Sequence, residues 1–350
     1  MKLRDDDNPR GQGTPTINDV AALAGVSKKT VSRFINKSPL MSDATREKVS
    51  AAIKQLDYVP NPQARALALR RNFMIALLHD NPNGQTVLNF QKGVLSAIKD
   101  TELALAVRPV DRTSPELLNE IESFLTKQRP LGVLILPPIS ERDDIVDLCK
   151  RLDVAYMRIG STALDEPAHC VASNDREVVR ELTAALLAAG HRTIGFVRGP
   201  EGFRSPIERE TGFRDAFADS GAALDESLMA QGNYRFGSGL EAGRKLLDRE
   251  DRPSAIFASN DEMASGVLHA AYSLGLEVPG DLEVVGFDDT STASHVWPTL
   301  TTVHWPIEEM GRLAAAKLVS EFLGEWTHEC DLEQVVVSSH IVERASAKLR

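Results

Sequence analysis

The chain has 350 residues and a formal net charge of −10, from 40 Lys and Arg and 50 Asp and Glu residues. This length predicts two or three domains and a core that needs neither a disulfide nor a metal for stability. No apolar run reaches the roughly 18 to 20 residues of a membrane helix, and the first residues lack the apolar segment of a signal peptide. The three cysteines are far apart, which indicates a reducing compartment. We therefore expect a cytoplasmic protein without membrane contact, disulfides or a zinc site.

The charge is unevenly distributed. Residues 14–71 contain ten Lys or Arg and four Asp or Glu, a net charge of +6, whereas residues 72–350 contain 27 basic and 43 acidic residues, a net charge of −16. A basic module joined to an acidic body is typical of a protein that binds a polyanion at one end only. Residues 1–13 are charged and contain one apolar residue, Leu3, so we expect a disordered tail there.

Residues 14–60 are predicted to form three short helices. Thr16 and Asp19 have the spacing of a capping box, and the residues that follow are apolar at helical spacing up to a turn at Gly25. Ser27 is a natural N-cap for a second helix over residues 28–36, and a third helix starts at Ser42. Two short helices around a glycine turn, supported by a third, are typical of a helix-turn-helix unit.

The second predicted helix has a polar face rich in groups that bind DNA, formed by Lys28, Lys29, Ser32, Arg33 and Asn36. Lysine and arginine bind guanine edges or phosphates, and asparagine pairs with adenine. The alternative is a basic helix face that is merely solvated. The capping box, the glycine turn and the charge asymmetry together favour DNA binding.

The following segment predicts a conditional helix. Asn61 as N-cap with Pro62 after it begins a helix over residues 61–71 that is too short to be stable alone, so it needs a docking partner. Leu67, which lies near three arginines, could insert into a minor groove, although an ordinary linker leucine is the alternative.

Residues 16–36, 42–49 and 58–67 together resemble the DNA-binding headpiece of the lac repressor (LacI) family of bacterial transcription regulators. The resemblance implies three groups of DNA contacts: base reading by Lys28, Lys29 and Arg33, phosphate binding by Thr16, Ser27, Thr30, Ser32 and Asn36, and minor-groove contacts by Asn61, Ala64, Arg65 and Leu67 of a hinge helix.

The acidic body alternates apolar, β-rich runs with helical stretches. The runs are Met74 to His79, Leu103 to Val110, Gly132 to Pro137, Ala155 to Ile159, Thr193 to Arg198, Ala255 to Ser259 and Leu282 to Phe287. This pattern predicts an α/β core of two doubly wound parallel sheets. The core, over residues 72–343, resembles the two-lobed periplasmic-binding-protein-like core of the same family. We expect one lobe over about 72–170 plus 303–330, the other over about 171–302 plus 331–343, and a tail over 344–350.

Ligands of such lobes bind at the carboxyl ends of the strands, in the cleft between the sheets. Polar candidates that follow strands are Asp80, Asn81, Asn260 and Asp288, and aromatic candidates that could pack on a sugar ring are Tyr234, Trp297 and Trp305. Each could instead be an ordinary loop or cap residue. The family resemblance places Asn260, Asp288, Tyr234 and Trp305 toward the effector.

One position departs from the family pattern. Ile207 is aligned where the family commonly has an effector-binding arginine, so we expect Arg204 or Arg209 to substitute for it. The chemistry of the effector therefore stays open at this stage.

These features predict a homodimeric, ligand-responsive repressor of a carbohydrate operon that binds pseudo-palindromic double-stranded DNA and needs no cofactor. The main alternative within the family is a repressor that depends on a purine or another small-molecule corepressor. A stand-alone sugar receptor would have a signal peptide in place of the basic module. An α/β enzyme is disfavoured because the sequence contains no nucleophile elbow and no P-loop, and the glycines of residues 237–243 do not follow a buried strand.

Overall fold

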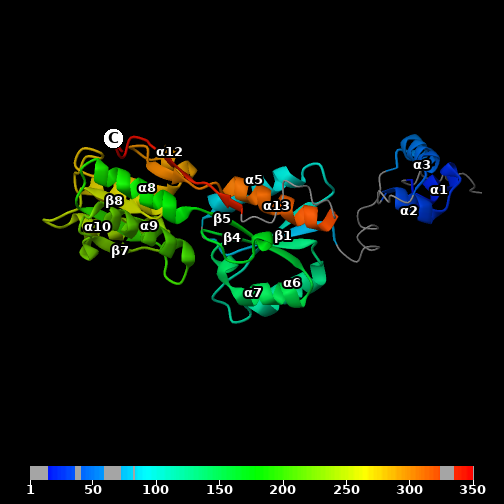
Figure 1. The fold of residues 1–350 in the computed structure, drawn as a ribbon, viewed down its shortest axis with the longest axis horizontal. Coiled ribbons are helices and arrows are strands. Elements are labelled where there is room, and N and C mark those ends of the chain that lie inside the picture. Colours follow the sequence, from blue (N-terminus) through cyan, green and yellow to red (C-terminus); the bar gives the residue numbers. More distant parts are fainter. Residues whose placement is uncertain (1–14, 36–40, 59–71, 82, 324–334, 350) are drawn as a thin grey trace, which may run out of the picture. The chain divides into compact units, whose positions relative to one another are not determined.

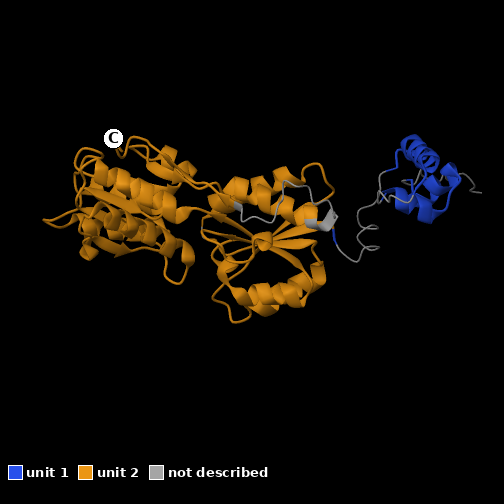
Figure 2. Ribbon diagram, viewed as in Figure 1, with its two compact units in different colours: residues 1–72 blue, residues 73–350 orange. Residues whose placement is uncertain are grey.

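The computed structural model describes residues 15–35, 41–58, 72–81, 83–323 and 335–349 (Figure 1). The chain forms two compact units, residues 1–72 and 73–350, which Figure 2 colours separately. Among the predicted DNA contacts, Asn36 and the whole hinge segment 61–71 lie outside the described residues. None of the helices described is long and apolar enough to cross a membrane.

The first unit contains three helices, α1 (Ile17–Ala24), α2 (Lys28–Ile35) and α3 (Asp43–Leu56). The predicted capping box is confirmed, because the Asp19 carboxylate accepts hydrogen bonds from the Thr16 backbone N–H and hydroxyl, both at 2.7 Å. Gly25 ends α1 at a φ of +65°, a conformation that costs glycine little. The buried residues of all three helices form one core: Val20, Ala21, Val31, Val49 and Ala52. The predicted helix-turn-helix arrangement is thus present.

The second unit is built on two six-stranded sheets. The first has the order β11-β5-β4-β3-β1-β2, and all its neighbouring strands are parallel. Its strands are β1 (Met74–His79), β2 (Ala104–Pro109), β3 (Gly132–Ile135), β4 (Ala155–Gly160), β5 (Cys170–Ser173) and β11 (Val335–Val337). The second has the order β12-β10-β9-β8-β6-β7, in which only β12 is antiparallel to its neighbour. Its strands are β6 (Ile194–Arg198), β7 (Met229–Gln231), β8 (Ala255–Ala258), β9 (Glu283–Asp288), β10 (Thr301–His304) and β12 (His340–Val342).

Helices cover both faces of each sheet, as the alternation of strands and helices predicts (Figure 1). The first sheet lies between the pair α5 (Gly84–Ile98) and α13 (Ile307–Leu323) and the pair α6 (Leu117–Gln128) and α7 (Asp143–Arg151). In the second lobe α8 (Asp175–Ala188) packs on α9 (Arg204–Ser220), and α10 (Phe236–Leu247) packs on α11 (Asp261–Ser273), with the short α12 (Ser291–His295) beside α11. Gly93 allows α5 to approach α13, since a Cβ there would lie 1.8 Å from the Glu308 carbonyl oxygen.

The chain crosses between the lobes at three places, after β5, after β10 and between β11 and β12. The expected lobe boundaries are therefore partly wrong. β10 pairs with β9 in the second lobe, and β11 pairs with β5 in the first. Apolar runs predict strands, but they do not say which sheet edge a late strand joins.

The predicted tail over residues 344–350 is also wrong for its described part. Ser346 and Ala347 are fully buried, and the Ser346 hydroxyl donates to the Val284 carbonyl at 2.6 Å. This segment completes the core of the second lobe because its backbone and side chains satisfy groups at the ends of β9 and β10.

Candidate functional site

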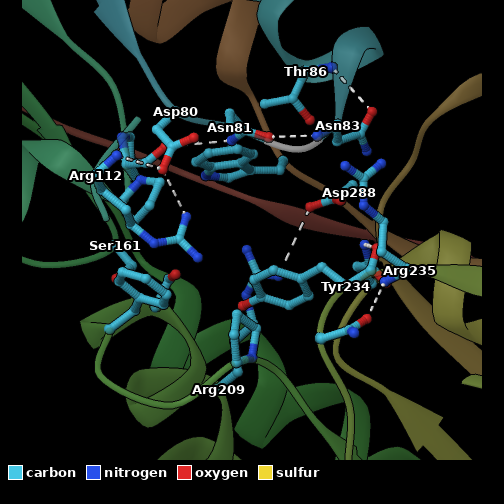
Figure 3. A pocket seen from close by; sticks show the side chains of 18 residues that line it. Asp80, Asn81, Asn83, Thr86, Arg112, Ser161, Arg209, Tyr234, Arg235 and Asp288 are labelled. Atoms are coloured by element: carbon cyan, nitrogen blue, oxygen red, sulfur yellow. Dashed lines mark hydrogen bonds and ion pairs between the residues drawn. The ribbon is translucent and has the colours of Figure 1, made fainter. Parts of the chain in front are cut away.

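A cavity of about 540 Å³ lies between the two lobes, at the carboxyl ends of their strands (Figure 3). Seven of the predicted effector residues line it: Asp80, Asn81, Arg209, Tyr234, Asn260, Asp288 and Trp305. The carboxyl ends of parallel strands collect these residues from distant parts of the sequence, as the fold rule predicts.

Arg209 is the central cation of the cleft. It is buried on α9, where its Nε donates to Asp175 at 2.9 Å and its Nη1 donates to the Ser259 carbonyl at 2.6 Å. The Nη1 atom also lies 3.8 Å from an oxygen of Asp288, and the guanidinium lies 3.5 Å from the centre of the Phe287 ring. These contacts fix the position of the guanidinium, and Arg209 lines the cavity. The buried Asp175 carboxylate pairs with this cation, and the Asp288 side chain lies beside it.

Asp288 ends β9 with a φ of +107°, which is unusual for a residue other than glycine. Backbone strain of this kind is found mainly at functional sites. Burial raises the pKa of Asp288 well above the ordinary aspartate value, and the neighbouring Asp261 and Asp175 act in the same direction, although Arg209 opposes them. The surroundings of this cleft residue therefore favour the neutral form of its carboxyl group.

The uncharged candidates are held by the protein itself. The Asn260 side chain caps α11 by accepting from the Met263 N–H at 2.9 Å, and it donates to the Tyr234 carbonyl at 3.1 Å. The Trp305 indole donates to the Ser173 hydroxyl at 2.9 Å, so its ring is fixed at the cavity wall. Asn260 is therefore a helix cap, which the sequence offered as the alternative to a ligand contact. Its amide also holds the loop of Tyr234 beside the cleft.

The first lobe contributes an ion pair. Asp80 follows β1 and accepts from Arg112 Nη1 at 2.9 Å, and the Arg112 guanidinium lies 4.7 Å from the centre of the Phe203 ring on the second lobe. Asn81 is committed to its own loop, because its Oδ1 accepts from the Asn83 N–H at 2.8 Å.

The DNA-binding candidates lie on α2 in the first unit. Val31 faces the core, whereas Lys28, Lys29 and Arg33 are exposed. Ser27 caps α2 as predicted: its hydroxyl accepts from the Thr30 N–H at 3.1 Å and lies 2.9 Å from the Thr30 hydroxyl. The three cations are therefore on the solvent side of the helix that a helix-turn-helix unit presents to DNA.

Comparison with known proteins agrees with both units. Residues 16–61 match the family described as bacterial regulatory proteins, lacI family, and residues 183–347 match the periplasmic binding protein-like domain. The HTH-type transcriptional regulator CelR of Thermobifida fusca is 36% identical over 341 residues, which cover 95% of this chain and 98% of CelR. The chain belongs to the LacI family.

Other members of the LacI family are similarly close. The ribose operon repressor of Escherichia coli K12 is 30% identical over 332 residues, covering 95% of this chain and 99% of the repressor. The solved lac repressor dimer bound to operator and an anti-inducer has a TM-score of 0.76 at 25% identity and covers 95% of this chain and 99% of its own. A solved CelR–cellobiose complex has a TM-score of 0.69 at 34% identity, covering 95% of this chain and 100% of that one. These relatives are transcription regulators.

Three predicted positions need correction within this LacI-family frame. Ile207 is 58% exposed and does not line the cavity, whereas Arg209, half a helical turn further along α9, does. Arg204 is also absent from the cavity lining, and its backbone N–H donates to Glu141 at 2.8 Å. Of the two arginines predicted to substitute at this position, Arg209 lines the cavity and Arg204 does not. Trp297 is 90% exposed and does not reach the cavity either.

Several lining residues were not predicted. They include Arg112, Ser161, Phe203, Ser205, Asn233 and Arg235. Arg112, Ser161 and Asn233 each come within three residues of a strand end, so the rule that selected Asp80 could have found them. Ser205 and Phe203 lie at the start of a helix and have no such signal.

Proposed function

We propose that this LacI-family regulator binds a pseudo-palindromic DNA site as a homodimer and represses a carbohydrate uptake or catabolism operon until a sugar binds in the cleft. In this proposal the protein acts in the cytoplasm. Two relatives support a sugar as the effector: CelR was solved with cellobiose, and another relative is named a ribose operon repressor.

The DNA-binding part of the proposal is based on the exposed side chains of helix α2. Lys28, Lys29 and Arg33 are exposed on a helix whose opposite face is fixed in the core by Val31, so the three cations keep a constant orientation. In the proposal these three read base edges in the major groove, and the hydroxyl groups at the helix starts bind phosphates: Thr16, Ser27, Thr30 and Ser32.

The cleft carries the ligand-binding part. Asp288 and Arg209 present an acceptor and a donor less than 4 Å apart, which suits neighbouring hydroxyls of a sugar ring. Trp305 and Tyr234 provide aromatic surface beside them, and Asn260 keeps one amide N–H available. Asp80 adds a second acceptor from the first lobe, and Asn81 orders the loop beside it.

The DNA-binding part is tested by selecting sites from a random double-stranded DNA library with the full chain. We expect enrichment of a palindrome, and we expect Arg33→Ala to weaken binding to that palindrome at least about tenfold, since a good bidentate base contact contributes roughly 1–3 kcal/mol. Lys54→Ala, which removes an exposed lysine of α3, is the matched control. A library that shows no enriched palindrome would overturn the proposal.

The ligand-binding part is tested by adding sugars to the complex of the protein with the selected DNA. We expect at least one sugar to lower the affinity for DNA, and Asp288→Ala to abolish that response while DNA binding itself persists. A purine that strengthens DNA binding, with no sugar response, would replace the sugar-released repressor by the corepressor-dependent alternative.

A further inference from the structure

The loop that follows β9 holds two successive residues in a strained backbone conformation. Asp288 has a φ of +107° and Asp289 a φ of +53°, values that are uncommon for residues other than glycine. Asp288 lines the cavity, whereas Asp289 does not. Such strain persists only where the surrounding structure holds the backbone in place. The contacts behind the cavity wall therefore decide whether Asp288 keeps its position.

The Asp289 carboxylate anchors this loop. Its Oδ1 accepts from Arg344 Nη2 at 2.6 Å, and its Oδ2 lies 3.0 Å from His304 Nδ1. Arg344 is itself fixed, since its Nη1 donates to the Leu300 carbonyl at 2.9 Å and its backbone N–H donates to the Thr301 hydroxyl at 2.8 Å. The hydrogen bond with His304 lowers the pKa of Asp289 most, and Arg344 acts in the same direction. The carboxylate is therefore charged and holds both partners.

A second anchor holds the other end of the loop. The buried Asp261 accepts from the Thr290 N–H at 2.7 Å and from the Thr290 hydroxyl at 3.0 Å. Its other oxygen accepts from the Thr302 hydroxyl at 2.5 Å. This second anchor remains when the Asp289 anchor is cut, so cutting the latter should loosen the loop without unfolding the lobe.

His304 is the titratable partner of the Asp289 anchor. It ends β10, and in the sheet it pairs with Asp288 on β9 and with His340 on β12. Histidine changes its charge between about pH 5 and pH 8, and a hydrogen bond between charged groups is about twice as strong as one between neutral groups. Protonation of His304 should therefore tighten the hold on Asp289.

The other charges around His304 act in both directions. Asp289 attracts a positive charge on the ring, whereas Arg344, which shares this carboxylate, and His340, whose ring centre is 4.8 Å away, repel one. Helix α8 also packs on β10 and β12, and its only buried ionisable side chain is Asp175, which is already in an ion pair. Among the described residues only Asp289 hydrogen-bonds the ring, so its attraction outweighs the repulsion.

We propose that Asp289, His304 and Arg344 are positioning residues for Asp288, and that the charge of His304 makes the affinity for the effector depend on pH. The proposal rests on the proposed function, in which Asp288 binds a sugar. None of the three residues lines the cavity, so they act through the loop backbone and do not touch the effector. When His304 is neutral or Arg344 is replaced, the effector must also order the loop. The repressor therefore responds to less sugar at about pH 6 than at about pH 8.

The first test is hydrogen–deuterium exchange of the ligand-free full chain, read in peptides that contain residues 288–292. Arg344→Gln is expected to speed exchange there at least about threefold and to leave first-lobe peptides unchanged, because only the loop is loosened. Arg249→Gln is the matched control: Arg249 also bonds a carboxylate, Asp251, and a backbone carbonyl, that of Ser227, and its side chain is 26% exposed against 22% for Arg344. Unchanged exchange of the loop in Arg344→Gln would overturn the proposal.

The second test is calorimetric titration with cellobiose, maltose, lactose, glucose, galactose and ribose at pH 6 and pH 8. Arg344→Gln is expected to weaken each sugar that binds roughly five- to fiftyfold, because the sugar must then restore the strained backbone. His304→Asn keeps a donor near the Nδ1 position but does not titrate. From pH 6 to pH 8 the original protein is expected to lose at least about threefold more affinity than His304→Asn. The titration of Asp288 is common to both proteins and cancels in this comparison.

Each outcome separates the parts of the proposal. Equal pH dependence of the original protein and His304→Asn would show that the charge of His304 has no role. If the loop exchanges faster in Arg344→Gln but sugars bind as tightly as they do to Arg249→Gln, the positioning role is wrong and the sugar-released repressor stands. If no sugar binds while the selected DNA site is bound, the sugar part of the proposed function fails, and the effect on affinity fails with it; faster exchange in Arg344→Gln would then support the anchoring of the loop alone.

Discussion

Neutralising Asp175 provides a direct test of the charge balance around Arg209. Asp175 is fully buried at the start of α8 and accepts hydrogen bonds from Arg209 Nε at 2.9 Å and from the Ser173 hydroxyl at 2.6 Å. Asparagine at this position keeps the shape and one acceptor oxygen, but it removes the charge. Arg209 would then face only Asp288, 3.8 Å away, and the Ser259 carbonyl.

The expected cost follows from the burial of both partners. Removing one member of a buried ion pair typically costs about 3–5 kcal/mol, because the remaining charge stays buried. The hydrogen bond to the Ser259 carbonyl and the nearby Asp288 side chain remain here, so we expect Asp175→Asn to lower the free energy of unfolding of the core by roughly 3 kcal/mol. For a unit of this size that corresponds to a fall in Tm of about 6–12 °C.

Differential scanning calorimetry of the full chain measures this effect. Asp219→Asn is the matched control, because it removes an equivalent ion pair with Arg180 whose side chains are 54% and 52% exposed. An exposed pair contributes at most about 1 kcal/mol. A Tm for Asp175→Asn no lower than that of Asp219→Asn would refute the reasoning. Asp175→Asn combined with Arg209→Met is expected to recover part of the loss, since the uncompensated charge is then gone.

Three further changes test other features of the core. Gly93→Ala places a Cβ 1.8 Å from the Glu308 carbonyl, so it should destabilise the core by about 3 kcal/mol or more in urea unfolding, and an unchanged midpoint would contradict the close packing of α5 and α13. Glu141→Gln weakens the acceptor that holds the Arg204 N–H across the cleft, so calorimetry should show a roughly two- to tenfold loss of affinity for every sugar, and a loss confined to one sugar would count against it. Asp288→Asn should abolish sugar binding. Burial raises the pKa of Asp288, so the folded protein binds a proton above pH 4 that the unfolded chain does not bind. Ligand-free Asp288→Asn should therefore exceed the original protein in stability by several kcal/mol at pH 8, with the difference vanishing toward pH 4. Equal pH profiles of the two proteins would contradict this.

The residues that the sequence locates well are those defined by local rules. A capping box or a glycine turn needs only neighbours in the chain, which is why Thr16, Asp19 and Gly25 have their expected places. The carboxyl ends of parallel strands meet at one edge, which is why Asp80 and Asp288 line one cavity although they are far apart in sequence.

The residues that the sequence misplaces depend on helix phase or on sheet order. Arg209 and Ile207 lie two residues apart on the same helix. Because successive helical residues are rotated by about 100°, the two side chains point in nearly opposite directions, so the arginine is buried and the isoleucine is exposed. A resemblance without an exact register does not distinguish them. Strand β11 belongs to the first sheet because it pairs with β5, and the paired residues are more than 160 positions apart in the sequence. Alternating apolar runs contain no information about such a pairing.

The cleft and the interlobe crossings are joined by one chain of hydrogen bonds. The Trp305 indole donates to the Ser173 hydroxyl, which donates to Asp175, which accepts from Arg209. Ser173 ends β5 and Trp305 follows β10, so both stand where the chain passes from one lobe to the other. A ligand changes the balance between two lobe arrangements only if it binds one of them more tightly. A ligand that bonds Asp80 on one lobe and Asp288 on the other has this property, because it loses one of these contacts if the lobes move apart. A ligand held by the second lobe alone would fill the cleft and leave that balance unchanged.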